Sequence, residues 1–556
     1  MNKKILIAAA WPYANGSLHF GHAASLIGGD VLARYHRLCG DDVLFVSGSD
    51  CHGTPIAVEA DKRGVHPSLI AEIYHKEFIE TLIDGLGFSY DTYTTTTTEN
   101  HAQTVQEIFT TLYEKELIYK KTEQLPYCIS CTRFLPDRYI EGECPKCHFE
   151  NARGDQCDNC GDLLDPHDLI HPKCKICGTL PEWRESEHFY LKLSVFADDL
   201  KKWIEKSEGW RTEAKNFSIT MLEQGLHDRA ITRDTEWGIA IPLSGYEQKR
   251  IYVWFEAVCG YLSASKEWAQ KNGNPDAWKD FWCHTQSFHY YVHGKDNILF
   301  HTIIWPAMLL GFHKDFHLPD RIYSSAYLTL EKQQFSKSRH HAVWLPDFLK
   351  NFDAEPLRYF LIANGPETSD ADFSWSEYAV KTNKELIGNV GNFINRTLSL
   401  IRANFPDGVR LQKNVEEYQN VFLDHIRESF SLVGAAIEQG NFKDAIRSVC
   451  ALTDEGNKFI NDTAPWVSVK TDKEKTIGDL GTAAYAIHCL SILLQPFLPR
   501  SAEKIARAFG ITLSEVWKAP EDVLYVAKEV EPFYKKIEDS EVETQKALLG
   551  GLSSQT

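Results

Sequence analysis

The sequence lacks an excess of positive charge. Its 77 acidic residues outnumber 59 lysines and arginines, which gives a formal net charge of −18. A protein that only coats the phosphates of nucleic acid needs the opposite balance, so this function is excluded. Any nucleic-acid contact has to use local basic clusters, although such clusters are more often just a solvated face. The candidates are Lys332, Lys337, Arg339, Lys381, Lys384, Arg396 and Arg402.

A secretory or membrane-spanning segment is also missing. The apolar run Ile5 to Trp11 is short and breaks at Pro12 without a small-residue cleavage pattern. No later apolar stretch approaches the roughly 18 residues that a membrane helix needs. We therefore expect a cytoplasmic protein that does not bind a membrane. The apolar fraction of 43% and the length of 556 residues predict three or four globular domains.

Cysteine is abundant but concentrated in one segment. Eight of the fourteen cysteines form four Cys-x-x-Cys pairs within fifty residues. In a chain without a secretory signal this pattern indicates metal binding, and a redox role is the weaker alternative. Eight thiolates suffice for two structural zinc sites of four cysteines each, but spacing alone does not determine which pairs share an ion. The pairs are Cys128/Cys131, Cys144/Cys147, Cys157/Cys160 and Cys174/Cys177.

The order of apolar patterns predicts an α/β fold. Ile5 to Ala10 reads as a strand, and a turn-rich loop then leads into a helix over 21–37. Strands recur at Asp42 to Ser47 and, much later, at His289 to Val292. This indicates a Rossmann-type parallel sheet that is split by the cysteine-rich insertion. From Tyr378 to about Phe509 apolar residues recur every three or four positions, which predicts an α-helical bundle.

The first candidate site is His19-Phe20-Gly21-His22, at the start of the first predicted helix. Two imidazoles at i and i+3 can face the same side of a helix N-terminus, where the backbone N–H groups and the dipole favour phosphate. Gly21 lets a nucleotide approach closely. The alternatives are two partly buried histidines or a metal pair.

The second candidate is the loop Gln334-Phe335-Ser336-Lys337-Ser338, which follows an apparent strand from Tyr323 to Leu330. A mobile lysine loop with two hydroxyls can close over a triphosphate and stabilise the departing pyrophosphate. Taken alone, an ordinary solvated loop is the more common explanation of such a sequence.

Together these motifs resemble the HxGH and KMSKS signatures of class I aminoacyl-tRNA synthetases. Within that class the sequence is similar to the methionyl-tRNA synthetase family over nearly its whole length. Gln334 replaces the first lysine of the second signature, although Lys332 lies close enough to substitute for it. Other departures are Trp11, in place of a smaller aliphatic residue, and Glu256-Ala257-Val258, in place of Asp-Ala-Pro. The stretches that carry the resemblance are 11–17, 50–55, 252–261 and 294–297, with His301.

The resemblance implies that the protein activates L-methionine with ATP and Mg²⁺ and transfers it to tRNA(Met). It also implies a nested cysteine arrangement, with the inner two pairs on one zinc and the outer two on the other. The implied catalytic residues are His19, His22, Lys337 and Arg233, and the ATP site adds Gly294, Lys295, Asp296 and Ser336. The implied methionine pocket comprises Trp11, Tyr13, Asp50, Trp254, Ala257, Tyr261 and His301, and the implied anticodon contacts are Asn392, Arg396 and Trp466.

Methionine has a long, uncharged side chain with a polarizable sulfur, so an aromatic-lined pocket with few polar contacts suits it. Plain core packing is the alternative for each aromatic residue, including Trp466. We expect a monomer, because no further domain is recognisable after the bundle. The predicted domains are 1–112 (catalytic, first half), 113–233 (insertion with two zinc knuckles), 234–322 (catalytic, second half), 323–382 (stem-contact region with the lysine loop) and 383–556 (helical anticodon-binding domain).

Two competing functions remain open. A class I synthetase for leucine, isoleucine or valine usually carries a longer editing insertion, and cysteine enzymes tend to place zinc in the catalytic pocket. A non-enzymatic tRNA-binding relative is the other alternative, which the change at Gln334 makes conceivable. The presence of both histidines, Asp50 and Lys337 favours an active enzyme.

Overall fold

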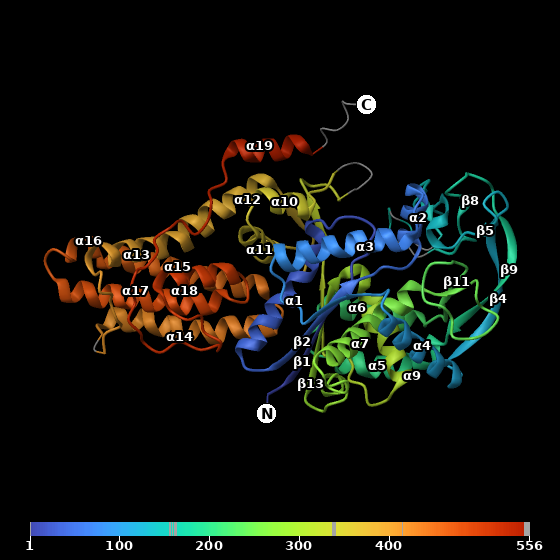
Figure 1. Cartoon of the computed structure of the whole chain (residues 1–556), viewed down its shortest axis with the longest axis horizontal. Coiled ribbons are helices and arrows are strands. Elements are labelled where there is room, and N and C mark those ends of the chain that lie inside the picture. The colour runs from blue at the N-terminus through green and yellow to red at the C-terminus, as the bar shows by residue number, and fades with distance from the viewer. Residues whose placement is uncertain are drawn as a thin grey trace.

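The protein is described here from a computed structural model, which covers residues 2–549 except 155, 156, 158, 161–163, 336–340 and 414. A five-stranded parallel sheet lies at its centre, in the order β14-β13-β1-β2-β3. Figure 1 shows this sheet between a bundle of long helices at one end and the cysteine-rich insertion at the other. The strands are β1 (Lys4–Ala9), β2 (Asp42–Ser49), β3 (Thr92–Thr95), β13 (Ser287–Gly294) and β14 (Arg321–Ser325).

Strand β1 is buried on both faces. Ile5 and Ile7 pack into one hydrophobic core, while Leu6 and Ala8 pack into a second core on the opposite face. This explains why β1 reads as a continuous apolar run, as parallel strands covered on both sides do. Strand β1 pairs with β2 on one side and with β13 on the other, so the chain connections diverge on either side of it. Such a place is called a topological switch point, and in open α/β sheets ligands bind there.

Helices cover both faces of the sheet. The first half of the sheet region contains α1 (Phe20–Leu38), α2 (Thr54–Arg63), α3 (Pro67–Phe78), the π-helical η1 (Ile79–Gly85) and α4 (Glu99–Glu114). The second half contains α7 (Val253–Lys271), α8 (Lys279–Trp282), the short 3₁₀ turn η4 (Lys295–Asn297), η5 (Phe300–Ile304) and α9 (Trp305–Phe312).

A buried ion pair fixes α1 against the rest of the chain. The Asp30 carboxylate and the Arg358 guanidinium lie 2.7 Å apart, and both side chains are fully buried. Arg358 also donates to the carbonyls of Leu86 and Phe497, the second of which follows a bundle helix. Burial alone would raise the pKa of Asp30, but Arg34 and Arg358 hold it at about 2. The helix that carries both candidate histidines is therefore anchored at its middle.

The insertion is built on a long antiparallel pair, β4 (Ile118–Cys128) with β9 (Glu182–Leu191). Short strands β5 (Arg133–Phe134) and β10 (Arg229–Ala230) complete this sheet, and a second sheet contains β6 (Ile140–Glu143), β7 (Ala152–Arg153) and β8 (Ile170–Cys174). The remaining elements are η2 (Asp137–Tyr139), η3 (Leu193–Phe196), α5 (Ala197–Lys206), α6 (Thr212–Gln224) and the pair β11 (Thr232–Arg233) with β12 (Arg250–Ile251).

The single strand predicted from Tyr323 to Leu330 is wrong. The segment forms two strands, β14 and β15 (Leu328–Leu330), because β14 pairs with β13 whereas β15 pairs with β16 (Ala371–Phe373). Strand β14 also crosses the domain boundary predicted between 322 and 323. The following helices are α10 (Leu345–Asn351), α11 (Ala354–Ala363) and α12 (Trp375–Lys381), which continues through the π-helical η6 (Thr382–Gly391) into α13 (Asn392–Asn404).

The predicted α-helical bundle is present and contains one unexpectedly apolar helix, α17 (Lys473–Leu494). By length and composition α17 could span a membrane, so the expectation that no later stretch approaches this length is wrong. However, 94% of its apolar window is buried inside the protein, which makes it the core helix of the bundle. The other helices of this region are α14 (Glu417–Glu438), α15 (Phe442–Thr463), α16 (Pro465–Ser468), α18 (Pro499–Phe509) and α19 (Asp539–Leu548).

Candidate active site

The two histidines cap the N-terminus of α1 reciprocally. The Gly21 N–H donates to Nδ1 of His19, and the His19 N–H donates to Nδ1 of His22, both at 3.1 Å. In a neutral imidazole whose Nδ1 accepts, the ring proton is on Nε2, so Nε2 is the atom that can donate to a phosphate. A Cβ at Gly21 would lie 2.9 Å from the His19 ring, so the motif needs glycine for the ring position as well as for ligand approach.

Both flanks of the lysine loop contact this helix mouth. Phe335 stacks on the His19 ring, with centroids 4.5 Å apart and planes within 6°. On the far side of the loop, Trp344 forms a β-bridge with His19, and the Leu345 N–H donates to the Leu18 carbonyl at 2.8 Å. Ser336 and Lys337 lie outside the described residues. The chain therefore enters and leaves the loop beside the histidine pair.

A cavity of about 590 Å³ opens at this place. Its walls include His19 and His22, Gly294 at the end of β13, Asp296 in η4, and Gln334. This size is within the range of small-ligand sites. A Cβ added at Gly294 would meet nothing within 4 Å, so protein packing alone does not require a glycine there. The structure thus brings together the His19/His22 pair, the start of the lysine loop and two further predicted ATP residues.

Lys295 and Asp296 are held by Tyr327, which lies just after β14, and by Asp370, which lies just before β16. The Lys295 ammonium lies 2.8 Å from an Asp370 carboxylate oxygen and 3.9 Å above the Tyr327 ring. The Tyr327 hydroxyl donates to Asp296. No local sequence signal marks Tyr327, because only the fold brings it beside the end of β13.

The predicted methionine residues form an aromatic group with a neutral polar end. Tyr13 lies edge-on to Trp254 with centroids 6.0 Å apart, and Trp254 stacks on Phe300 at 4.1 Å. The Tyr261 hydroxyl bonds His301 Nε2 at 2.7 Å, and His301 Nδ1 faces the Asn297 carbonyl at 2.8 Å. Burial lowers the pKa of His301 well below its usual range, so the ring is neutral. Ala257 lies on α7 one turn before Tyr261.

Trp11 fits between two glycines. A Cβ at Gly48 would lie 2.7 Å from the indole ring, and a Cβ at Gly260 would lie 2.8 Å from it. The buried indole Nε1 has no hydrogen-bond partner among the described residues. The large Trp11 ring therefore fits because Gly48 of β2 and Gly260 of α7 carry no side chain. This places Trp11 against α7, the helix that also carries Trp254.

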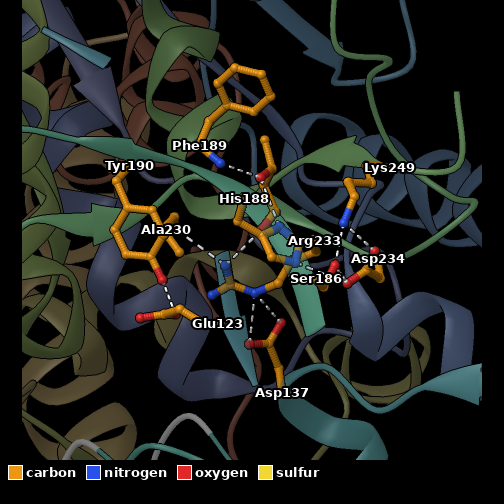
Figure 2. Close-up of polar contacts among 11 residues, drawn as sticks. Glu123, Asp137, Ser186, His188, Phe189, Tyr190, Ala230, Arg233, Asp234 and Lys249 are labelled. Carbon is orange, nitrogen blue, oxygen red and sulfur yellow. Dashed lines mark hydrogen bonds and ion pairs between the residues drawn. The ribbon is translucent and has the colours of Figure 1, made fainter. Parts of the chain in front are cut away.

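Arg233 lies apart from the histidine cavity. Its guanidinium is 3.1 Å from Asp137 of the insertion and stacks over the Tyr252 ring at 3.7 Å. It also donates to the carbonyls of Ala230 and Thr232. Figure 2 shows the contacts of Arg233 with Asp137 and Ala230 beside the His188–Asp234–Lys249 group. Arg233 lines a different cavity of about 380 Å³, between the insertion and Trp254.

The eight paired cysteines form two clusters. In the outer cluster Sγ–Sγ distances of 3.4 Å (Cys128 to Cys177) and 3.9 Å (Cys131 to Cys174) match the roughly 3.8 Å expected around a tetrahedral zinc. The inner cluster has comparable distances of 3.6 and 3.9 Å. The donor set therefore fits zinc. The clusters are Cys128/Cys131/Cys174/Cys177 and Cys144/Cys147/Cys157/Cys160, the nested arrangement implied by the family resemblance.

Replacing one inner ligand should remove one metal and leave the other. We expect Cys144→Ser to reduce the zinc content from about two ions per chain to about one, because the outer cluster shares no ligand with the inner one. Atomic emission spectroscopy of the purified protein measures this. Cys283→Ser is the control, because Cys283 is an exposed cysteine outside both clusters. Retention of two ions by Cys144→Ser would contradict the assignment.

The bundle presents the predicted anticodon residues at one end. Arg396 donates to the Asn461 side chain at 2.8 Å and lies 5.3 Å from the Trp466 ring centroid. Trp466 is 43% exposed, so it is not a bundle-core residue. Ala464, in the left-handed conformation, ends α15, and Pro465 starts the short helix that carries the indole. Asn392, one turn before Arg396, bonds Asn457 at 2.8 Å.

If Trp466 stacks on a base of tRNA, its removal should affect only the tRNA-dependent step. We expect Trp466→Ala to lower kcat/KM for tRNA aminoacylation by roughly ten- to a hundredfold, the value of one base–aromatic stack, and to leave ATP–pyrophosphate exchange unchanged. Val467→Ala is a matched control, since Val467 is also exposed and adjacent. Equal effects of the two substitutions would argue against stacking.

Comparisons with known proteins agree with this architecture. The family model "tRNA synthetases class I (M)" matches residues 5–398, and "Anticodon binding domain of methionyl tRNA ligase" matches residues 409–554. The methionine–tRNA ligase of Dehalococcoides mccartyi strain CBDB1 is 47% identical over 557 residues, which cover 99% of this chain and 100% of the relative. That of Bacillus cereus strain B4264 is 45% identical over 550 residues, covering 98% and 99%.

A solved structure has the same fold. Mycobacterium tuberculosis methionyl-tRNA synthetase in complex with methionyl-adenylate superposes with a TM-score of 0.79 at 22% identity, covering 96% of this chain and 99% of that one. The parallel sheet, the histidine motif at its switch point and the first family model define a class I aminoacyl-tRNA synthetase. Within that class, the near-full-length relatives and the second model show that the chain belongs to the methionyl-tRNA synthetase family. The predicted family and fold class are confirmed.

Proposed function

We propose that the protein joins the methionine carboxylate to the α-phosphate of ATP, releasing pyrophosphate, and then transfers the methionyl group to the 3′ end of tRNA(Met). His19 and His22 donate from Nε2 to the phosphates, and Lys337 supplies positive charge as pyrophosphate leaves. Gly294 and Asp296 hold the ribose. Magnesium accompanies the ATP and neutralises phosphate charge when bound.

One observation carries this proposal. The histidine pair, the residues that flank the lysine loop and the end of β13 meet at one cavity. Since these three segments are far apart in the sequence, their convergence at a helix N-terminus supports a common triphosphate site. Arg233 is proposed only as a residue that reaches the substrate after the contact with Asp137 rearranges.

The aromatic group of the predicted methionine residues supports methionine as the amino acid. Its polar end, Tyr261 with His301, is uncharged, which suits a thioether better than a charged side chain. Asp50 lies at the end of β2 and is the carboxylate proposed to pair with the α-ammonium group. The remaining pocket residues, Trp11, Tyr13, Trp254 and Ala257, are proposed to contact the side chain.

ATP–pyrophosphate exchange with each of the twenty amino acids tests the proposed function. We expect stimulation by methionine alone. Stimulation by leucine, isoleucine, valine or cysteine would assign the protein to another specificity. No exchange with any amino acid, together with retained tRNA binding, would indicate a relative that has lost turnover.

A further inference from the structure

Three buried ionisable groups lie together where the α-ammonium group is proposed to bind. Asp50 is 3% exposed, His52 is 6% exposed and Glu256, in the first turn of α7, is fully buried. His52 Nδ1 and Glu256 Oε1 are 2.6 Å apart, and the His52 backbone N–H donates to Asp50. The second Glu256 oxygen is buried and has no hydrogen-bond partner among the described residues.

This trio is short of one positive charge. Two buried carboxyl groups lie beside one imidazole: the His52 ring pairs with Glu256, whereas Asp50 is contacted by the His52 backbone N–H. Within the described chain the only ion-pair partner of Glu256 is His52. The other titratable neighbours add no cation: burial lowers the pKa of His101 to about 3, and burial raises the pKa of the Cys51 thiol. Tyr13, which bridges Asp50 through its backbone, carries a phenol. Buried charges without a partner are unfavourable, so the trio needs either a bound proton or a bound cation.

We propose that His52 is a positioning residue for the substrate ammonium group. By binding Glu256, His52 leaves Asp50 as the carboxylate that receives the ammonium. The ammonium then displaces a proton from Asp50. This inference rests on the proposed function. The proton passes from the Asp50 carboxyl group to solvent, and the ammonium keeps its own three protons. The ammonium thus takes the place of the proton, and the site stays neutral.

The direction of the resulting pH dependence follows from Asp50. Burial and the neighbouring Glu256 carboxylate raise the pKa of Asp50 well above its usual range. Below that pKa the ligand-free protein holds the proton, so methionine has to displace it and binds more weakly. KM for methionine should therefore rise as pH falls, by at most about tenfold per pH unit.

Calorimetry on the unmodified protein provides the first test. L-Methionine is titrated at several values between about pH 5.5 and 8, in buffers that differ in ionisation enthalpy. We expect net proton release that approaches one per methionine at low pH and declines as pH rises. Methionine binding without proton release over this whole range would overturn the inference. Absence of methionine binding would instead count against the proposed function.

Substitutions test the part played by His52. We expect His52→Asn to raise KM for methionine at neutral pH by about tenfold, with kcat nearly unchanged. Without its imidazole partner, the Glu256 carboxylate raises the pKa of Asp50 further, so a proton competes more strongly with methionine. Adding Glu256→Gln to that variant removes the opposing charge and should return KM close to the original value. A purely structural role for His52 predicts no such rescue.

Glu267→Gln is the matched control for this series. Glu267 lies on the same helix, about three turns from Glu256, and accepts a hydrogen bond from Thr94 while pairing with Lys271. Its substitution should leave both KM and proton release unchanged. Melting temperatures of all variants are compared. If His52→Asn does not fold, the calorimetry of the unmodified protein still tests whether methionine displaces a proton from Asp50, and absence of proton release would still overturn the inference.

Discussion

His19→Asn should lower the rate of methionyl-adenylate formation by about 10²–10³, the usual effect of removing one donor to a transition-state charge. The side-chain oxygen of asparagine can accept the Gly21 N–H in place of His19 Nδ1, so the cap is retained. What is lost is Nε2, the atom proposed to donate to phosphate. ATP–pyrophosphate exchange should therefore show a reduced kcat with nearly unchanged KM for methionine.

Two further variants separate capping from catalysis. His19→Ala removes the cap as well, so it should lower the unfolding free energy by about 1 kcal/mol in addition. His66 caps α3 in the same way, accepting from the Ser68 N–H at 3.3 Å, but it lies outside the cavity at α1. His66→Asn should accordingly leave exchange intact. Near-normal exchange by His19→Asn would remove that residue from the catalytic mechanism.

The local parts of the fold could be predicted from the sequence. Apolar runs and helical periodicity identified β1, β2, β13 and α1, because strands buried on both faces and amphipathic helices leave patterns within a few residues. The break between β14 and β15 was not predictable in this way. Both halves of that segment are compatible with a strand, and only their different partners, β13 and β16, separate them.

The same division applies to the candidate site. His19 and His22 were identifiable because two histidines around a glycine at the start of a helix indicate a phosphate site, and this pattern lies within four residues. The roles of Phe335, Trp344 and Tyr327 depend on segments brought together from distant parts of the chain, and no local signal marks them. Glu256 is an intermediate case: it was noted as a departure from Asp-Ala-Pro, but its contact with His52 required the fold.

Helix α17 illustrates the limit of composition as evidence. Its apolar length resembles that of a membrane span, yet the surrounding helices of the bundle bury it almost entirely. A helix that is apolar all round can be the centre of a protein core or a membrane segment, and the sequence of the helix alone does not distinguish them.

Lys337→Ala should reduce methionyl-adenylate formation by about 10²–10³ with little change in methionine affinity, because the lysine is proposed to bind charge that develops only as pyrophosphate departs. Lys332→Ala tests whether Lys332 replaces the lysine missing at Gln334. Lys332 lies just after β15, where its backbone N–H donates to Asp372, and it does not line the cavity. Its substitution should therefore cost less than about tenfold.

Single-turnover measurement of adenylate formation, with ATP and methionine varied separately, distinguishes these effects. Gln334, unlike Lys332, does line the cavity, but its amide supplies no charge. The positive charge at the triphosphate should thus come from Lys337 rather than from Gln334 or Lys332. If Lys332→Ala were the more damaging of the two, the loop would have to reach the cavity in a different register, with Lys332 in the role proposed for Lys337. If neither substitution slowed adenylate formation, the loop would have no part in the reaction, despite its contact with the histidine pair.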